Sequence, residues 1–343
     1  MASAPRIVSA FIVLTARARR IALRAWSRAC NFSARGAVDI AVTTSRGSDK
    51  KQGMAARRVI IQYCPVPPGL ERYVTALFYC DVDLGADERL HDVLCPDWAT
   101  FRFHYGSPVR ASTRSGCRID GSRFTVSGPR AQEVRFSMGT ARQWGFRVTP
   151  LGWAALIDAP AYLYADRLVD GDVDAVFARF LPLHGLLSDV DVSPGVHLDC
   201  LIAFLAGLEL REVAHEALIV AIGDAVLDPE LRTAVDLAAA VGAHPRMVER
   251  VCRAAFGFSP KLLLRRQRFL RSVEQFTEAP ALKWIGAMDE AYHDQAQFVR
   301  DFKAFMGMTP REYAALEKPL TETLMRERVR LGRTGMGRRF RAG

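Results

Sequence analysis

The spacing of hydrophobic and polar positions changes along the chain at about residue 170. Between residues 58 and 170, apolar and aromatic residues recur in short runs with the two-residue period of half-buried strands. Turn-forming pairs such as Ser107-Pro108 and Asp120-Gly121 separate the runs. The pattern predicts strands at 73–82, 99–105, 123–126, 133–138, 145–148 and 153–157. Several short, regularly spaced strands are typical of a barrel or a double-sheet jelly roll.

After residue 170 the apolar positions follow the helical period, first at Val173, Val176, Phe177 and Phe180. The stretch 197–222 predicts two or more amphipathic helices, suited to packing on the barrel or on a second copy of the chain. Short helices separated by tight turns continue to about residue 320. We therefore expect an α+β chain, in which a cupin-like β-barrel or jelly roll with flanking helices precedes an all-α domain.

The all-α part repeats itself after 50 residues. Equivalent positions of the two copies hold similar residues: Val248 and Phe298, Arg250 and Arg300, Arg253 and Lys303, and the tetrapeptides at 257–260 and 307–310. Each copy is predicted as helix, turn and helix: 234–240 and a helix from Pro245, then 284–291 and a helix from the N-cap Asp294 to Met306. The joining helix 261–271 carries five cations and no acid. Paired helices of this kind form a helix-turn-helix, whose second helix fits the DNA major groove.

Five segments of this part are similar to one known family: 237–242, 245–250, 257–260, 294–303 and 307–313. Residues of about 228–315 thus resemble the double helix-turn-helix domain of the AraC/XylS family of transcriptional regulators. Three positions depart from the family's usual residues. Ala291 replaces Gly, Gln297 replaces His, and His244 replaces the Ser or Thr that caps the first recognition helix.

The resemblance implies a sequence-specific, DNA-binding transcription regulator, by family habit an activator, whose recognition helices enter successive major grooves about 34 Å apart. The expected base-reading residues are Pro245, Arg246, Glu249, Gln295, Ala296 and Val299. The expected phosphate contacts are Arg250, Arg253, Lys261, Arg265, Arg300 and Lys303. For each cation the alternative is a solvated charge or a structural ion pair, and for Arg300 an internal pairing is an equal alternative.

The resemblance also implies further partners besides double-stranded promoter DNA. Candidates are RNA polymerase, a small-molecule effector on the N-terminal half, and a second copy of the chain bound through residues 197–222.

A cupin-type metal enzyme with a helical appendage is the alternative function. Such enzymes gather histidine and carboxylate ligands, often from a His-x-His pair. This sequence has no such pair, and its histidines at 91, 104, 184 and 197 are scattered. The aromatic residues Trp98, Phe101, Phe103, Trp144, Phe146 and Trp153 either line a small-molecule pocket or form plain core, and plain core is the favoured interpretation. We expect no catalytic residue, metal or cofactor.

The net charge of +10 belongs to the two ends of the chain. Residues 1–53 hold ten Lys/Arg and two acids, residues 321–343 hold seven and two, and residues 54–223 are net −4. The basic composition alone is therefore weak evidence for DNA binding. Seven scattered cysteines without a CxxC pair favour a reducing, cytoplasmic setting. The apolar run near the N-terminus is far shorter than the roughly 20 residues that a bilayer requires.

The changes in hydrophobic pattern and in charge along the chain predict four segments. They are a basic extension (1–57), a sensory and dimerisation domain (58–223), the double helix-turn-helix domain (224–320) and a basic flexible tail (321–343). Three interpretations of the extension are open: a transit peptide, a disordered basic arm that adds phosphate contacts, or an upstream misassignment of the start, with Met54 as the first residue. The last is favoured, because clean strand patterns begin only after Met54.

Overall fold

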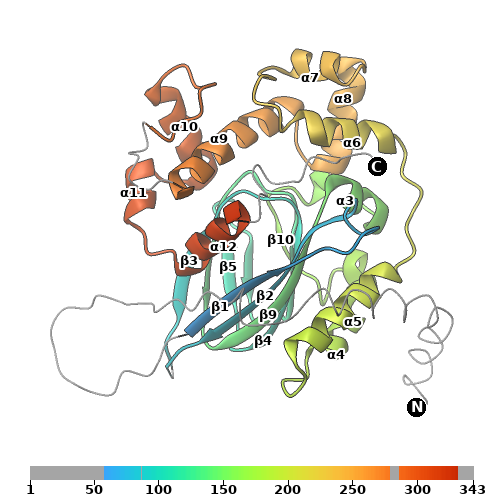
Figure 1. Ribbon diagram of the computed structural model, residues 1–343, viewed down its shortest axis with the longest axis vertical. Coiled ribbons are helices and arrows are strands. Elements are labelled where there is room, and N and C mark those ends of the chain that lie inside the picture. The colour runs from blue at the N-terminus through green and yellow to red at the C-terminus, as the bar shows by residue number, and fades with distance from the viewer. Residues whose placement is uncertain (1–57, 86, 279–285, 331–343) are drawn as a thin grey trace.

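The computed structural model describes residues 58–85, 87–278 and 286–330. In it a β-sandwich, called the barrel below, carries helices on one face, and the C-terminal helices lie together across one end of the sandwich (Figure 1). The predicted extension 1–57 and residues 331–343 of the predicted tail lie outside the described residues.

The described strands form two antiparallel sheets. The six-stranded sheet has the order β1-β2-β9-β4-β7-β10, and the four-stranded sheet has the order β3-β8-β5-β6. The bounds of the first are β1 (Arg58–Cys64), β2 (Val74–Asp83), β4 (Thr100–Gly106), β7 (Phe124–Ser127), β9 (Ala141–Val148) and β10 (Leu168–Asp170). Those of the second are β3 (Leu90–Leu94), β5 (Arg110–Thr113), β6 (Arg118–Asp120) and β8 (Val134–Met138). The predicted α+β class with a cupin-like N-terminal part is confirmed.

The six-stranded sheet has one aromatic and one polar face, because side chains alternate along β4, β7 and β9. The aromatic face packs against the helices and is formed by Phe101, Phe103, Phe124, Val126, Trp144 and Phe146. Those helices are η2 (Ala161–Leu163), η3 (Ala175–Phe180), α4 (Pro182–Leu187) and α5 (Pro194–Ala206). The opposite face looks toward the second sheet and presents Arg102, His104, Thr125, Ser127, Gln143 and Arg147. The aromatic residues are thus core, as the favoured interpretation stated.

The strand predicted at 153–157 is wrong, because Pro150–Leu156 form helix α3. The Thr149 hydroxyl accepts a hydrogen bond from the Gly152 amide at 2.7 Å, and Pro150 stands at the start of the helix. A run of five apolar residues fits the strand and helix periods equally well, and these two start signals decide for the helix.

The predicted helical stretch 197–222 contains two helices, α5 and α6 (Glu216–Ala225). Gly207 ends α5, and His215, whose φ of 61° lies in the left-handed region, precedes α6.

The C-terminal domain contains the two predicted recognition helices. Its elements are α7 (Ala234–Ala240), α8 (Pro245–Val251), the π-helical turn η4 (Cys252–Phe256), α9 (Pro260–Glu278), α10 (Gln295–Met306) and α11 (Pro310–Ala315). The helices predicted at 234–240, from Pro245 and up to Met306 are confirmed, and the joining helix is longer than predicted.

The helix predicted at 284–291 is wrong where the structure describes it, because residues 286–291 form turns. Residues 284 and 285 lie outside the described part. The buried Asp289 carboxylate accepts a hydrogen bond from the Ala291 amide at 3.0 Å and pairs with Arg271 on α9. Such local bonding by an aspartate competes with helix formation.

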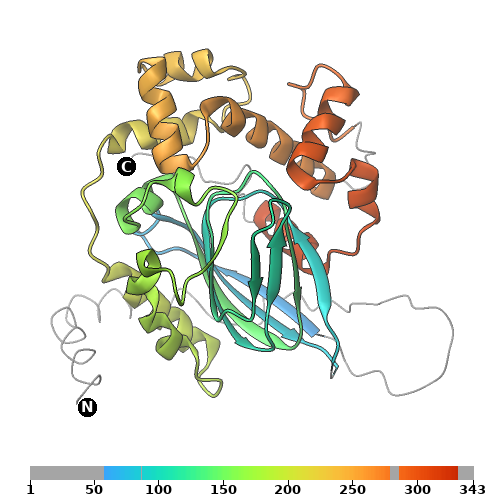
Figure 2. The same cartoon turned by 180° about the vertical axis from the view of Figure 1, so that it is seen from behind.

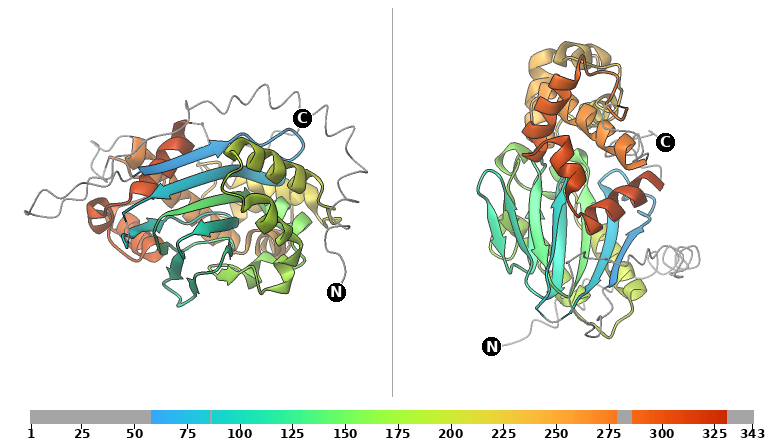
Figure 3. Two further views of the ribbon diagram at one scale, coloured as in Figure 1. Left: turned by 90° about the horizontal axis from the view of Figure 1, so that it is seen from below. Right: turned by 90° about the vertical axis from the view of Figure 1, so that its left-hand side faces the viewer.

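The predicted flexible tail begins with an ordered helix, α12 (Pro319–Arg330). This helix lies between β1 and β3, the edge strands of the two sheets (Figure 3, right). Leu320 is only 3% exposed and packs with Val59 and Leu90 of these strands. The basic composition of the segment obscured the apolar side of α12, which carries Leu320, Leu324 and Met325.

One apolar cluster runs from the barrel into the C-terminal domain. Trp98 packs against Phe256 with ring centres 5.8 Å apart, and the guanidinium of Arg266 on α9 lies 4.0 Å from the Trp98 ring. Arg266 is 1% exposed and donates a hydrogen bond to the Arg130 carbonyl. The C-terminal domain is therefore packed onto the barrel. Among the described helices, none combines the length and apolarity needed to cross a bilayer.

Candidate nucleic-acid interface

The first recognition helix, α8, begins with a histidine cap. Nδ1 of His244 accepts a hydrogen bond from the Arg246 amide at 3.3 Å, and Pro245 occupies the first helical position. His244 thus replaces the Ser or Thr expected there. Val248 and Val251 are buried, whereas Pro245 and Arg246 are exposed. The start of α8 therefore presents the predicted base-reading side chain of Arg246 to solvent.

Two further cations of this unit already have partners. Nε of Arg253 lies 2.7 Å from Oε1 of Glu249, one helical turn away, and Arg250 hydrogen-bonds to Nε2 of His215 at 3.1 Å. The Arg253–Glu249 pair is largely exposed, with side-chain exposures of 58% and 41%. An exposed pair at this spacing contributes only about 0.3–0.5 kcal/mol. DNA can therefore replace it at little cost.

The second recognition helix, α10, has a stronger start. The Asp294 carboxylate accepts from the Gln297 amide at 2.6 Å, and the Gln297 side chain accepts from the His293 amide at 3.1 Å. Gln297 therefore works as a capping residue. The inner side of α10 buries Phe298, Phe302 and Phe305. The predicted contact residues lie on its outer side: Gln295, Ala296, Arg300 and Lys303 are exposed, and Val299 is half-buried.

The linking helix α9 supplies a cationic groove between the two units. Six cations line it against one acid, Asp301: Arg232, Lys261, Arg265, Arg268, Arg271 and Arg300. Arg265 and Arg268 form ion pairs with the buried Asp301, at 2.5 and 3.3 Å. Arg265, a predicted phosphate contact, is thus also a structural residue. The described residues provide no ion-pair partner for Lys261 or Arg300.

Arg232, Arg268 and Arg271 join this groove without having been predicted. Arg268 and Arg271 belong to the cationic run of the linker, and this run was the available signal. Arg232 comes from the segment before α7, and only the fold places it there.

Both helix-turn-helix units contact the barrel at the C-terminal ends of their recognition helices, and the N-terminal ends of these helices point away from it (Figures 1 and 2). The end of the first unit, η4, packs on η2 and α3. At the end of α10, the barrel residue Arg114 donates to the Lys303 carbonyl at 2.9 Å and to the Ala304 carbonyl. Helix N-termini carry the side chains that reach base edges in this kind of domain. The barrel therefore holds both reading ends on the outer surface.

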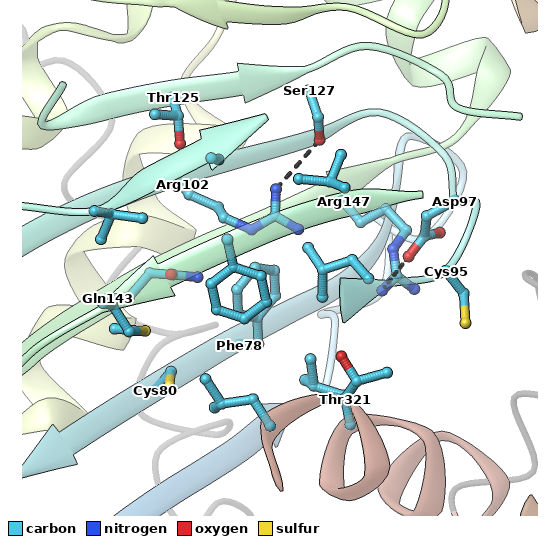
Figure 4. A pocket seen from close by; sticks show the side chains of 18 of the residues that line it. Phe78, Cys80, Cys95, Asp97, Arg102, Thr125, Ser127, Gln143, Arg147 and Thr321 are labelled. Atoms are coloured by element: carbon cyan, nitrogen blue, oxygen red, sulfur yellow. Dashed lines mark hydrogen bonds and ion pairs between the residues drawn. The ribbon is translucent and has the colours of Figure 1, made fainter. Parts of the chain in front are cut away.

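The barrel interior contains a second candidate site (Figure 4). It is lined by the polar side chains that alternate with the aromatic ones, and by Leu320, Thr321, Leu324 and Met325 of α12. The aromatic residues were candidates for a pocket lining, whereas their polar neighbours were not predicted. The missed signal was the recurrence of Arg102, His104, Thr125 and Arg147 inside otherwise apolar strands.

The histidines of the barrel do not gather into a metal site. Nε2 of His104 lies 2.8 Å from the Thr125 hydroxyl, and Nε2 of His184 lies 2.7 Å from an Asp172 oxygen. Within the described part of the chain, no three His, Cys, Asp or Glu side chains lie where they could share a metal ion.

Comparison with known proteins identifies the C-terminal domain. Residues 237–315 match the family model described as "Helix-turn-helix domain". No curated protein matches the chain.

Among solved structures, ToxT from Vibrio cholerae has a TM-score of 0.36 at 10% identity, over 66% of this chain and 98% of that chain. ToxT with a bound unsaturated fatty acid gives 0.35 at 10% identity, over 66% and 95%. The AraC-like transcriptional activator CuxR gives 0.29 at 12% identity, over 63% and 81%. These are distant similarities, and the matched domain with its two exposed recognition helices carries the assignment. The chain is thus a DNA-binding transcription regulator whose C-terminal residues 237–315 are a helix-turn-helix domain.

Proposed function

We propose that this protein regulates transcription by reading two successive major grooves of promoter DNA, one with α8 and one with α10. The placement of the two recognition helices carries the proposal. Both have buried inner faces, capped N-termini and exposed N-terminal side chains, and both are held at their C-terminal ends by the same barrel.

The reading residues follow from position and chemistry. Arg246 suits bidentate pairing with guanine, and Gln295 suits pairing with adenine. Pro245, Ala296 and Val299 offer apolar contact, for example with a thymine methyl group. Glu249 can accept a hydrogen bond from cytosine once its ion pair with Arg253 is broken.

The phosphate contacts divide into two groups. Lys261, Arg300 and Lys303 are exposed and have no ion pair with a described residue, so they can bind phosphates directly. Arg250, Arg253 and Arg265 already contact protein groups. Each would bind a phosphate either beside its present partner or in place of it. The groove along α9 suits the phosphate backbone between the two reading sites, because its cations outnumber its acid.

The finer parts of the proposal follow from the family resemblance. The regulator is proposed to be an activator that contacts RNA polymerase and responds to an effector in the barrel interior. Residues 197–222 are the proposed dimer contact, supported by the exposed apolar side chains of Leu210 within this range and of Val196 next to it.

Selection of bound duplexes from a random DNA pool tests the reading mode. At about 0.15 M salt the full chain should enrich two blocks one helical turn apart. Arg246→Ala should relax the preference at one base position of one block, by about 1–3 kcal/mol or roughly 5- to 150-fold.

Arg118→Ala is the matched control, because it removes an equal charge from an exposed site on the barrel strand β6. It should leave both blocks intact. If Arg246→Ala and Arg118→Ala select the same sequences as the unaltered chain, Arg246 does not read bases.

A further inference from the structure

The cavity between the sheets carries more positive charge than its lining neutralises. Arg102, Arg130 and Arg147 line it together with one acid, Asp97. Arg147 pairs with Asp97 at 2.9 Å, while Arg102 donates only to the neutral Ser127 hydroxyl, at 3.2 Å (Figure 4). Asp166 and Arg266 lie behind Arg130, so the wider cluster still holds four arginines against two aspartates.

Several nitrogen atoms of this cluster lack hydrogen-bond partners among the described residues. They are Nε of Arg147, Nε and Nη1 of Arg130 and Nε of Arg266. Burial, together with the neighbouring Arg130, lowers the pKa of Arg102 to about 9. Arg102 is still protonated at neutral pH. An unbalanced buried charge is costly unless an anion pairs with it.

The rest of the lining selects the kind of anion. Apolar side chains make up most of it, including Phe78, Val109, Phe136, Met138 and Leu324. A carboxylate matches the planar fork of a guanidinium, and an apolar body matches these walls. The cavity has a volume of about 90 Å³. At about 10–15 Å³ for each, this corresponds to roughly six to nine waters, or a ligand of similar size.

We propose that this cavity binds a small organic carboxylate, with its charged group on Arg102 and Arg147 and its apolar body beneath α12. Because α12 covers the cavity, a ligand bound there would alter DNA binding by the C-terminal domain. This part of the proposal rests on the proposed regulatory function.

The α12 cover connects the cavity to the DNA-binding domain. The Asp92 carboxylate on β3 accepts hydrogen bonds from the Leu320 amide at 2.8 Å and the Thr321 amide at 2.9 Å, at the start of α12. The Thr321 hydroxyl donates to the Val93 carbonyl. Since α12 follows α11 in the chain and packs on α9, a ligand that touches Thr321 or Leu324 contacts a segment continuous with the helix-turn-helix units.

A second connection runs through Asp97. A carboxylate on Arg147 competes with Asp97 for the same guanidinium. The Asp97 carbonyl accepts from the Arg130 amide at 2.8 Å, and the Arg130 carbonyl accepts from Arg266 of α9. Binding in the cavity therefore acts on the helix that sets the spacing of the two recognition helices.

Titration calorimetry of the full chain with hexanoate, which has eight non-hydrogen atoms, tests the site without DNA. Hexanoate should bind saturably, and hexanamide, equal in size but uncharged, should bind at least ten-fold more weakly. Arg102→Gln should lose at least ten-fold in hexanoate affinity, and the exposed control Arg118→Gln should lose none. Equal binding of the acid and the amide, or unchanged affinity of Arg102→Gln, would overturn the proposal.

Two further measurements guard against a folding artefact. Arg102→Gln should unfold without ligand at a temperature equal to or above that of the unaltered chain, because it removes unbalanced charge. Ala111→Leu, which narrows the cavity and keeps every arginine, should also weaken hexanoate binding. Full binding by Ala111→Leu would contradict the assigned position of the apolar body.

Hydrogen exchange and DNA binding test the role of α12. Hexanoate should slow exchange of amides 320–326 in the unaltered chain, and it should change affinity for the selected duplex several-fold, but not in Arg102→Gln. If hexanoate binds and the hydrogen exchange of amides 320–326 stays unchanged, α12 does not cover the bound ligand. If hexanoate binds and slows exchange while no duplex is selected, the ligand site stands and the proposed DNA-reading function fails.

Discussion

Asp92 shows how much one buried carboxylate decides in this chain. Its oxygen Oδ2 accepts from two amides at the start of α12, and the residue is 7% exposed. Burial raises the pKa of Asp92 to about 6, although the hydrogen bonds from Thr321, Val93 and Leu320 oppose the shift. The charged carboxylate is thus useful as an acceptor and costly to bury.

The shift predicts a pH dependence of stability. Because the pKa of Asp92 is higher in the folded chain than its ordinary value of 3.8, the folded state binds the proton more tightly. Its contribution to the free energy of unfolding is fully present below pH about 4 and lost as the pH rises through about 6.

Urea unfolding at several pH values should therefore show the unaltered chain losing about 3 kcal/mol relative to Asp92→Asn over this window. Asparagine keeps an oxygen acceptor for the two amides and does not titrate here. A constant difference between the two proteins from pH 4 to 7 would contradict the assigned shift.

At the scale of single elements, α10 depends on the barrel for its C-terminal end. The Lys303 carbonyl accepts from the amide of the C-cap Gly307 at 3.0 Å and also from Arg114, which donates to the Ala304 carbonyl as well. The Glu133 amide donates to the Phe305 carbonyl at 2.9 Å. A cation at this end also complements the helix dipole.

Arg114→Ala should loosen α10 and lower affinity for a duplex with both reading blocks by a few-fold, for a cost of about 0.5–1 kcal/mol. Affinity for a duplex with only the α8 block should not change. Fluorescence anisotropy with the two duplexes measures the difference. An equal loss of affinity for both duplexes would mean that Arg114 acts through its positive charge alone and not by holding α10.

At the scale of the whole molecule, α12 closes the sandwich. It fills the space between the edge strands β1 and β3, where the two sheets do not pair. Without a cover these edges would expose unpaired backbone groups. Leu320 anchors the helix among Val59, Ile61 and Met138.

Leu320→Ala should cost about 2–4 kcal/mol, because it leaves a space in a packed cluster. Hydrogen exchange should then show α12 losing protection while α8 and α9 keep theirs. Leu316→Ala is the control, since Leu316 is 37% exposed and only four residues away. Similar losses for both variants would show that α12 is not docked through Leu320.

The C-terminal domain was predictable because its signals are local. Proline at the start of α8, the Asp294 cap, glycine after each recognition helix and the repeated apolar positions all act within a few residues of their own helices. The strand periods of the barrel are local in the same way. The prediction at 153–157 failed because an apolar run fits both periods. The helix predicted at 284–291 failed over its described part, 286–291, because Asp289 bonds to a distant helix.

By itself, the sequence determined the strand-rich first part and the helical second part of the chain, the two capped recognition helices and their exposed side chains, because neighbouring residues decide capping and periodicity. The tertiary structure alone decided which cations are free, which face of the six-stranded sheet encloses the cavity, and where α12 docks. Those properties depend on contacts between residues far apart in the chain, such as Asp92 with Thr321 and Arg114 with Lys303. No local pattern encodes such partners, since each arises only when the barrel and the helical domain pack together.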